Sequence, residues 1–117
     1  MEVIYTAQEL TFGHGIYSWA GMALGDTGKP VGASGAGDRT VQVEGTFGVG
    51  GTVLIEGTLN MTTWYPLHDP FGSLLSFTAA GMKAILENVI AVRPNVSGGD
   101  GSTLITATII ARRSING

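Results

Sequence analysis

The sequence has no cysteine among its 117 residues, and this absence excludes several kinds of site. Without thiols there is no disulfide framework, no thiolate nucleophile and no zinc site built on cysteine. A chain of this length is expected to form one domain, and it is long enough to bury a hydrophobic core without such cross-links.

Charged residues are also scarce, at 13% of the chain, about half the share of an ordinary globular domain. The net charge is −3, and the only basic cluster is Arg112-Arg113. Phosphate binding needs a basic face, so we expect no nucleic-acid partner. Two explanations of the low charge stay open: partners cover part of the surface, or Thr, Ser, Asn and Gly supply the missing polarity.

Long apolar runs are missing as well. No stretch of about 18 apolar residues is present, so we expect no membrane span. The first ten residues, MEVIYTAQEL, lack a basic region followed by an apolar run, so we expect no signal peptide.

The clearest positive pattern lies in residues 39–59, where apolar and polar residues alternate on both sides of the glycine-rich run 48–51. Such alternation is typical of half-buried strands, and two such runs around a glycine cluster predict a β-hairpin. The residues that we expect in the core are Val41, Val43, Phe47, Val53 and Ile55.

This hairpin would place Glu44 directly opposite Glu56, and two facing carboxylates repel each other. Three readings stay open. A bulge separates the two residues, an arginine lies between them, or they face a cation or a basic residue of a partner. The arginines considered are Arg39, Arg93 and Arg112. A glycosidase pair is disfavoured because no cleft of aromatic residues is evident around them.

The rest of the chain predicts short strands separated by turns, at residues 16–24, 64–67, 89–96 and 104–113. Residues 78–87 predict one short helix, with Thr78 as its cap and Met82, Ile85 and Leu86 on one face. The predicted fold is therefore mainly β, a single antiparallel β-sandwich or barrel that is jelly-roll-like, with at most this one helix. We expect residues 1–15 to form an N-terminal arm or edge strand and residues 16–117 to form the sandwich domain.

Residues that could carry catalysis are few. The only histidines are His14 and His68, and no nucleophile and orienting carboxylate can be assigned to either. Asp100 lies in a Gly-Asp-Gly turn that resembles part of a calcium loop, but the further carboxylates of such a loop do not follow. We therefore expect no enzyme, no cofactor and no metal. Trp19 and Trp64 could form a sugar-stacking platform, although core packing is the favoured role.

Several motifs resemble those of a group of small tailed-phage virion proteins. They are Gly45-Thr46-Phe47-Gly48, Ile55-Glu56-Gly57, Trp64, Leu67, Asp69-Pro70, Gly72, Thr78-Ala79-Ala80-Gly81, Arg93-Pro94 and Gly98-Gly99-Asp100-Gly101, and the upstream Gly25-Asp26-Thr27-Gly28 and Asp38-Arg39 also fit. The similarity covers roughly residues 16 to 113. The group usually has Ser-Asn-Asp-Gly after Ile-Glu-Gly, whereas this chain has Thr58-Leu59-Asn60-Met61-Thr62. The departure predicts a different turn, with Leu59 or Met61 exposed.

The resemblance implies a capsid decoration (cement) protein, made in the host cytoplasm and located on the capsid surface of the virion. It implies binding to the major capsid protein, stabilisation of the head, and a homo-oligomer, with a trimer the favoured form. The candidate partner-contact residues are Glu44, Glu56, Lys29, Leu59 and Met61. Two alternatives stay open: a head–tail connector or tail structural protein, and a carbohydrate-binding β-sandwich for host attachment.

Overall fold

The computed structural model describes residues 1–11, 14–32 and 37–112, and these residues form twelve strands and no helix. The strands are β1 (Glu2–Val3), β2 (Thr6–Thr11), β3 (His14–Met22), β4 (Thr27–Gly28), β5 (Val31–Gly32), β6 (Asp38–Thr46), β7 (Thr52–Thr58), β8 (Tyr65–Pro66), β9 (Ser76–Phe77), β10 (Gly81–Ala84), β11 (Ala91–Gly98) and β12 (Leu104–Arg112).

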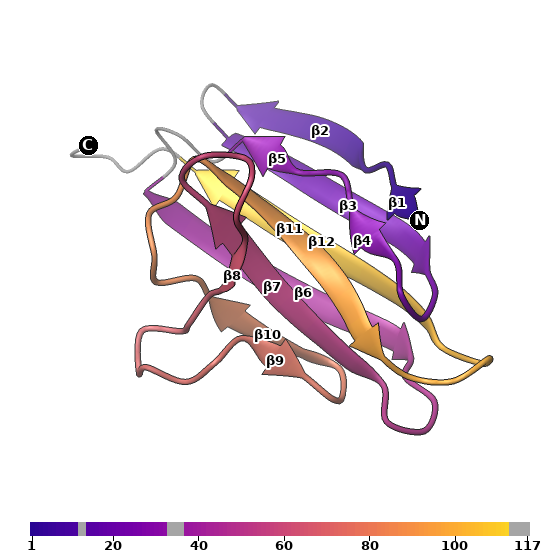
Figure 1. Cartoon of the computed structure of the whole chain (residues 1–117). Coiled ribbons are helices and arrows are strands. Elements are labelled where there is room, and N and C mark those ends of the chain that lie inside the picture. Colours follow the sequence, from indigo (N-terminus) through magenta and orange to yellow (C-terminus); the bar gives the residue numbers. More distant parts are fainter. Residues whose placement is uncertain (12–13, 33–36, 113–117) are drawn as a thin grey trace.

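The strands form two sheets that pack face to face, so the fold is a β-sandwich and not a closed barrel (Figure 1). One sheet has the order β10-β6-β12-β3-β2. The other has the order β1-β4-β11-β7-β8, with β5 also paired to β11 and β9 also paired to β7. The predicted sandwich is confirmed, while the barrel alternative is wrong.

The core lies between the sheets and is built from the inward rows of the long strands. Alternation in β6 and β12 places every second residue in this layer, because successive side chains of a strand point to opposite faces. The predicted core residues Val41, Val43, Val53 and Ile55 are fully buried, while Phe47 is half-buried and packs against the same cluster. The other large apolar side chains that are fully buried are Trp19, Met22, Leu75, Val92, Val96, Ile105 and Ile109.

The predicted hairpin at residues 39–59 is wrong, because β6 and β7 belong to different sheets. β6 pairs with β12 and β7 pairs with β11, so the glycine-rich run 48–51 carries the chain from one sheet to the other as an arch. Strand alternation is the same in a hairpin and in an arch, and only the distant partners β11 and β12 decide between them. Glu44 and Glu56 are therefore not opposite each other.

A second arch, residues 99–103, joins β11 to β12 and is hydrogen-bonded to the first. The Asp100 carboxylate accepts hydrogen bonds from the Val49 N–H (2.8 Å) and from the N–H (2.9 Å) and hydroxyl (2.6 Å) of Ser102. The Thr103 hydroxyl donates to the Phe47 carbonyl at 2.7 Å. Asp100 is thus a turn-forming residue that fastens the two arches together.

The predicted helix at residues 78–87 is also wrong. Residues 81–84 form β10, the edge strand that pairs with β6 in the register Gly81↔Val43 to Ala84↔Thr40. Thr78 lies in a bend and caps no helix. A segment this short gains little from helix propensity, so pairing with the exposed edge of β6 prevails.

The N-terminal residues pair with both sheets of the same chain. β2 is the outer strand of the five-stranded sheet and pairs with β3, while β1 pairs in parallel with β4 at the outer side of the other sheet. Among the described residues, no helix has the length and hydrophobicity needed to cross a membrane.

Candidate functional site

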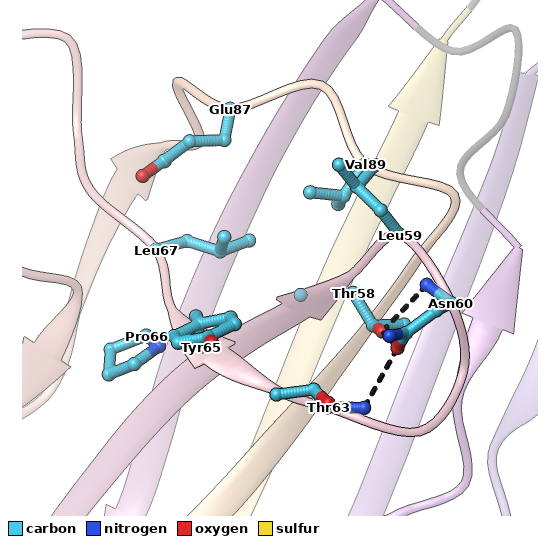
Figure 2. Close-up of a pocket in the computed structure, with 10 residues that line it drawn as sticks. Thr58, Leu59, Asn60, Thr63, Tyr65, Pro66, Leu67, Glu87 and Val89 are labelled. Carbon is cyan, nitrogen blue, oxygen red and sulfur yellow. Dashed lines mark hydrogen bonds between the residues drawn. The ribbon is translucent and has the colours of Figure 1, made fainter.

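An apolar pocket of about 300 Å³ opens where β7 ends. Its walls come from three stretches: the end of β7 with its following loop, β8 with Leu67, and the segment 85–90 (Figure 2). The lining residues are Gly57, Thr58, Leu59, Asn60, Thr63, Tyr65, Pro66, Leu67, Glu87 and Val89. Concave, mostly apolar surfaces with a few polar groups are where proteins usually bind other molecules.

The loop over this pocket is held by its own side chains. Asn60 Oδ1 accepts from the N–H groups of Thr62 (2.9 Å) and Thr63 (2.8 Å), and Thr58 Oγ1 accepts from the N–H groups of Asn60 (3.2 Å) and Met61 (3.0 Å). Met61 has a φ of 62°, which is rare for a residue with a long side chain. The loop is therefore ordered, with Leu59 72% and Met61 52% exposed. The exposure predicted from the motif departure is confirmed for both residues.

The walls of the pocket are apolar. Figure 2 shows Tyr65 and Leu67 facing Leu59 and Val89 across the opening. Gly57 permits this arrangement, because a Cβ there would lie 2.9 Å from both Leu67 and Val89. An occupant would therefore meet mainly carbon atoms.

The polar side of the pocket is Glu87, which is hydrogen-bonded to His68. The Glu87 carboxylate lies 2.6 Å from His68 Nδ1, and its other oxygen accepts the His68 backbone N–H at 2.8 Å. Burial alone would raise the pKa of Glu87, but the hydrogen bonds from the His68 side chain and backbone outweigh it and hold the pKa below its ordinary value. Glu87 therefore stays ionised at neutral pH.

Arg39 holds the segment that carries Glu87. Its side chain points into the sandwich and the whole residue is 3% exposed. Nη2 donates to Asn88 Oδ1 at 2.9 Å, and the Arg39 carbonyl accepts the Ile85 N–H at 3.0 Å. Burial lowers the pKa of Arg39, and the Glu87 charge opposes that shift. Arg39 thus fixes one wall of the pocket from inside.

The other candidate contact residues lie elsewhere. Glu44 is exposed near the end of β6, and Lys29 is exposed with its ammonium 5.8 Å from the Tyr5 ring centre. Glu56 is 8% exposed and its carboxylate accepts from Arg93 Nε (3.0 Å) and Asn95 Nδ2 (3.2 Å). An arginine of the same chain therefore engages Glu56, but it does not lie between Glu56 and Glu44, because the two residues belong to different sheets. Among the five candidates, only Leu59 and Met61 belong to the loop over the pocket.

The other residues considered for catalysis or ligand binding do not come together in one site. The side chain of His14 lies outside the described residues, as does Arg113, while His68 is engaged with Glu87. Trp19 is fully buried and donates to the Lys29 carbonyl at 3.0 Å. Within residues 1–11, 14–32 and 37–112, no group of three or more His, Asp or Glu side chains could hold a metal ion.

Exposed apolar side chains gather in one segment, which the sequence pattern did not reveal. Of the thirteen large hydrophobic residues that are exposed in the described part of the chain, eight fall within residues 59–90. They are Leu59, Met61, Tyr65, Phe71, Leu74, Met82, Leu86 and Ile90. We call this set the apolar side. The strands β8 and β10 of this segment are the edge strands opposite β1 and β2 in the two sheets (Figure 1). The Pro-Phe-Gly sequence at residues 70–72 was the one local signal, because an aromatic residue at a turn tip is left exposed.

Together these features describe an all-β sandwich with a concentration of exposed large hydrophobic residues in residues 59–90. No family model and no curated protein matches the chain. Among solved structures, the fold is similar to the crystal structure of SPBc2 prophage-derived protein YomS. The identity is 11%, the TM-score is 0.63, and the match covers 89% of this chain and 98% of that one. At this identity the likeness shows a shared fold.

Proposed function

We propose that this protein is a structural component of a tailed-phage particle that binds the major capsid protein lattice and stabilises the head. The observation that carries the proposal is the apolar side, with eight exposed large hydrophobic residues in residues 59–90. Monomeric proteins rarely keep large apolar patches in water, so such a surface is typical of one that a partner covers. The fold shared with a prophage-derived protein and the resemblance of the turn motifs both support a phage origin.

The mechanism would be binding energy and not chemistry. A protein that bridges neighbouring capsid subunits raises the free energy needed to pull them apart against packaged DNA. A standard interface buries about 800 Å² per partner, and several subunits that engage at once gain strength by avidity. The rigid sandwich suits this role because little conformational entropy is lost on docking.

The direct test is to add the purified protein to expanded capsids that lack it, and to measure co-sedimentation and added density by cryo-electron microscopy. We expect saturable binding at fixed lattice positions. Capsids that show neither binding nor added density would overturn the proposal, and binding confined to the portal vertex would favour a connector.

Two substitutions test whether the apolar side is the surface that contacts the capsid. Met61→Glu and Met82→Glu put a charge on the apolar side, and each should weaken capsid binding by about tenfold or more. Leu104→Glu is the matched control, since Leu104 is similarly exposed but lies at the opposite end of the sandwich, beside the arches. It should bind as the unaltered chain does. Equal losses in all three variants would contradict this placement.

A further inference from the structure

Phe71 is a projecting aromatic side chain on a rigid tip. It is 94% exposed, so it makes almost no contact within its own chain. Asp69 Oδ1 accepts the N–H groups of Phe71 (2.9 Å) and Ser73 (3.0 Å), and the Asp69 N–H donates to the Ser73 carbonyl at 2.8 Å. Gly72 allows the turn with a φ of 85°. A preorganised aromatic anchor loses little entropy on binding and is a frequent hot spot of interfaces.

The pocket beside β8 has the size and chemistry to receive such a side chain. An apolar cavity of about 150 Å³ is enough for a benzene molecule, and this pocket has about 300 Å³. Its walls are Leu59, Leu67 and Val89, with the Tyr65 ring available for an aromatic contact.

We propose that Phe71 of one copy inserts into this pocket of a second copy, so that the chain assembles head to tail. Every copy carries both halves of the contact, and the exposure of Phe71 shows that they do not meet within one chain. The Phe71 loop also presents no free carboxylate to Glu87 at the pocket, because Asp69 is buried and bonded within its own turn. A second copy is therefore an occupant of matching shape and without charge repulsion.

The geometry fixes the orientation of successive copies, so the assembly would be regular and not a flexible chain of copies. His68 ties the base of the Phe71 loop to the pocket wall, since its carbonyl accepts the Leu86 N–H at 2.8 Å and its ring and N–H bind Glu87. The angle between Phe71 and the pocket is thus fixed. A contact between two different patches closes into a ring when that angle permits.

The surface area that a copy would bury in such a ring is also a reasonable share of its total surface. With about 800 Å² buried per partner at each of two contacts, a copy in a ring would cover about a quarter of its 6195 Å² surface.

The test is the mass of the purified chain in solution, measured by sedimentation equilibrium over a range of concentrations. We expect a defined multiple of the 12.1 kDa monomer. Phe71→Ser should weaken association by at least about tenfold. Val49→Ser, a change at an exposed apolar loop residue in the first arch, should leave the mass unchanged. An unaltered chain that stays monomeric at every concentration, or a Phe71→Ser variant that keeps the full mass, would overturn the proposal.

A mixing experiment tests the head-to-tail geometry. Phe71→Ser keeps an intact pocket, while Leu59→Glu keeps Phe71 and places a charge at the pocket opening. Each variant alone should be monomeric, and a mixture of the two should form a one-to-one dimer that grows no further. Leu104→Glu controls for the added charge and should assemble normally. A mixture that stays monomeric, or that restores the full oligomer, would contradict a head-to-tail contact.

This inference does not depend on the proposed function. No capsid is present in either measurement, so failure of self-association leaves capsid binding open, and failure of capsid binding leaves the oligomer intact.

Discussion

The segments that flank β7 differ in how they meet the solvent. At its start, the arches 47–51 and 99–103 satisfy their polar groups within the chain, with Asp100 as the shared acceptor. At its end, Asn60 accepts hydrogen bonds from backbone N–H groups of the loop over the pocket. The side chains of Leu59 and Met61 in this loop are nevertheless exposed to solvent. The comparison teaches that apolar exposure here does not follow from a poorly formed loop. Both ends are ordered and both expose apolar side chains, and we propose that a partner covers only the end that carries Leu59 and Met61.

The largest expected effect is at the arch end. Gly51→Ala would place a Cβ 2.0 Å from the Phe47 carbonyl oxygen, which is backbone and cannot move without opening the arch. We expect a loss of about 3 kcal/mol or more in the free energy of unfolding, measured by urea denaturation. A loss below about 1 kcal/mol would show that the arch is looser than its hydrogen bonds indicate.

Gly57→Ala is the matched change at the other end of β7. There a Cβ would meet the side chains of Leu67 and Val89 at 2.9 Å, and side chains can shift. The expected loss is about 1–2 kcal/mol, and the displaced side chains should narrow the pocket and weaken self-association. Unchanged association despite the lost stability would argue against the pocket as a contact.

Met61→Asn should raise the stability of the loop end. Its φ of 62° lies in the left-handed region, which asparagine tolerates better than methionine. We expect a gain of about 0.5 kcal/mol in the same measurement, together with weaker capsid binding. Met82→Asn is the control, because no positive φ is relieved in β10 and a strand disfavours asparagine. A loss of stability at Met61 would contradict the ordered loop.

The smallest effect concerns Asp100, because the carboxylate is exposed to solvent. Hydrogen bonds from the Ser102 hydroxyl and from the Val49 and Ser102 N–H groups lower its pKa to about 2, from an ordinary 3.8. Since the folded pKa is the lower one, its contribution is present above about pH 4 and is lost as the pH falls towards 2. Asp100→Asn should remove this part of the acid dependence, seen as a smaller change in the urea midpoint between pH 5 and pH 2.5. An unaltered acid profile would show that Asp100 does not fasten the arches.

The inward rows of the sandwich were predictable from the sequence, because strand alternation is a local pattern. Val41, Val43, Val53 and Ile55 could be assigned to the core without knowing any strand partner. The path between the strands could not be predicted in the same way. A glycine-rich turn is compatible with a hairpin or an arch, and the choice is made by hydrogen bonds to β11 and β12, which lie about forty residues or more further along the chain.

The candidate site was predictable only in part. Leu59 and Met61 stood out because the turn after β7 departs from the motif of the phage proteins that the sequence resembles. The pocket did not, because it joins residues from three stretches, including Glu87 in a segment predicted to be helical. Phe71 was missed because an exposed aromatic side chain gives no periodic pattern.

The central claim is that the apolar side is covered when the protein works, and the four methionines allow a direct measurement. Met61 and Met82 lie on the apolar side, Met1 is exposed elsewhere and Met22 is fully buried. Hydroxyl-radical footprinting should compare the protein on assembled particles with the dilute free chain. We predict that oxidation of Met61 and Met82 falls several-fold on assembly, while Met1 stays reactive and Met22 stays protected. Equal oxidation of Met61 and Met82 in both states would contradict the account.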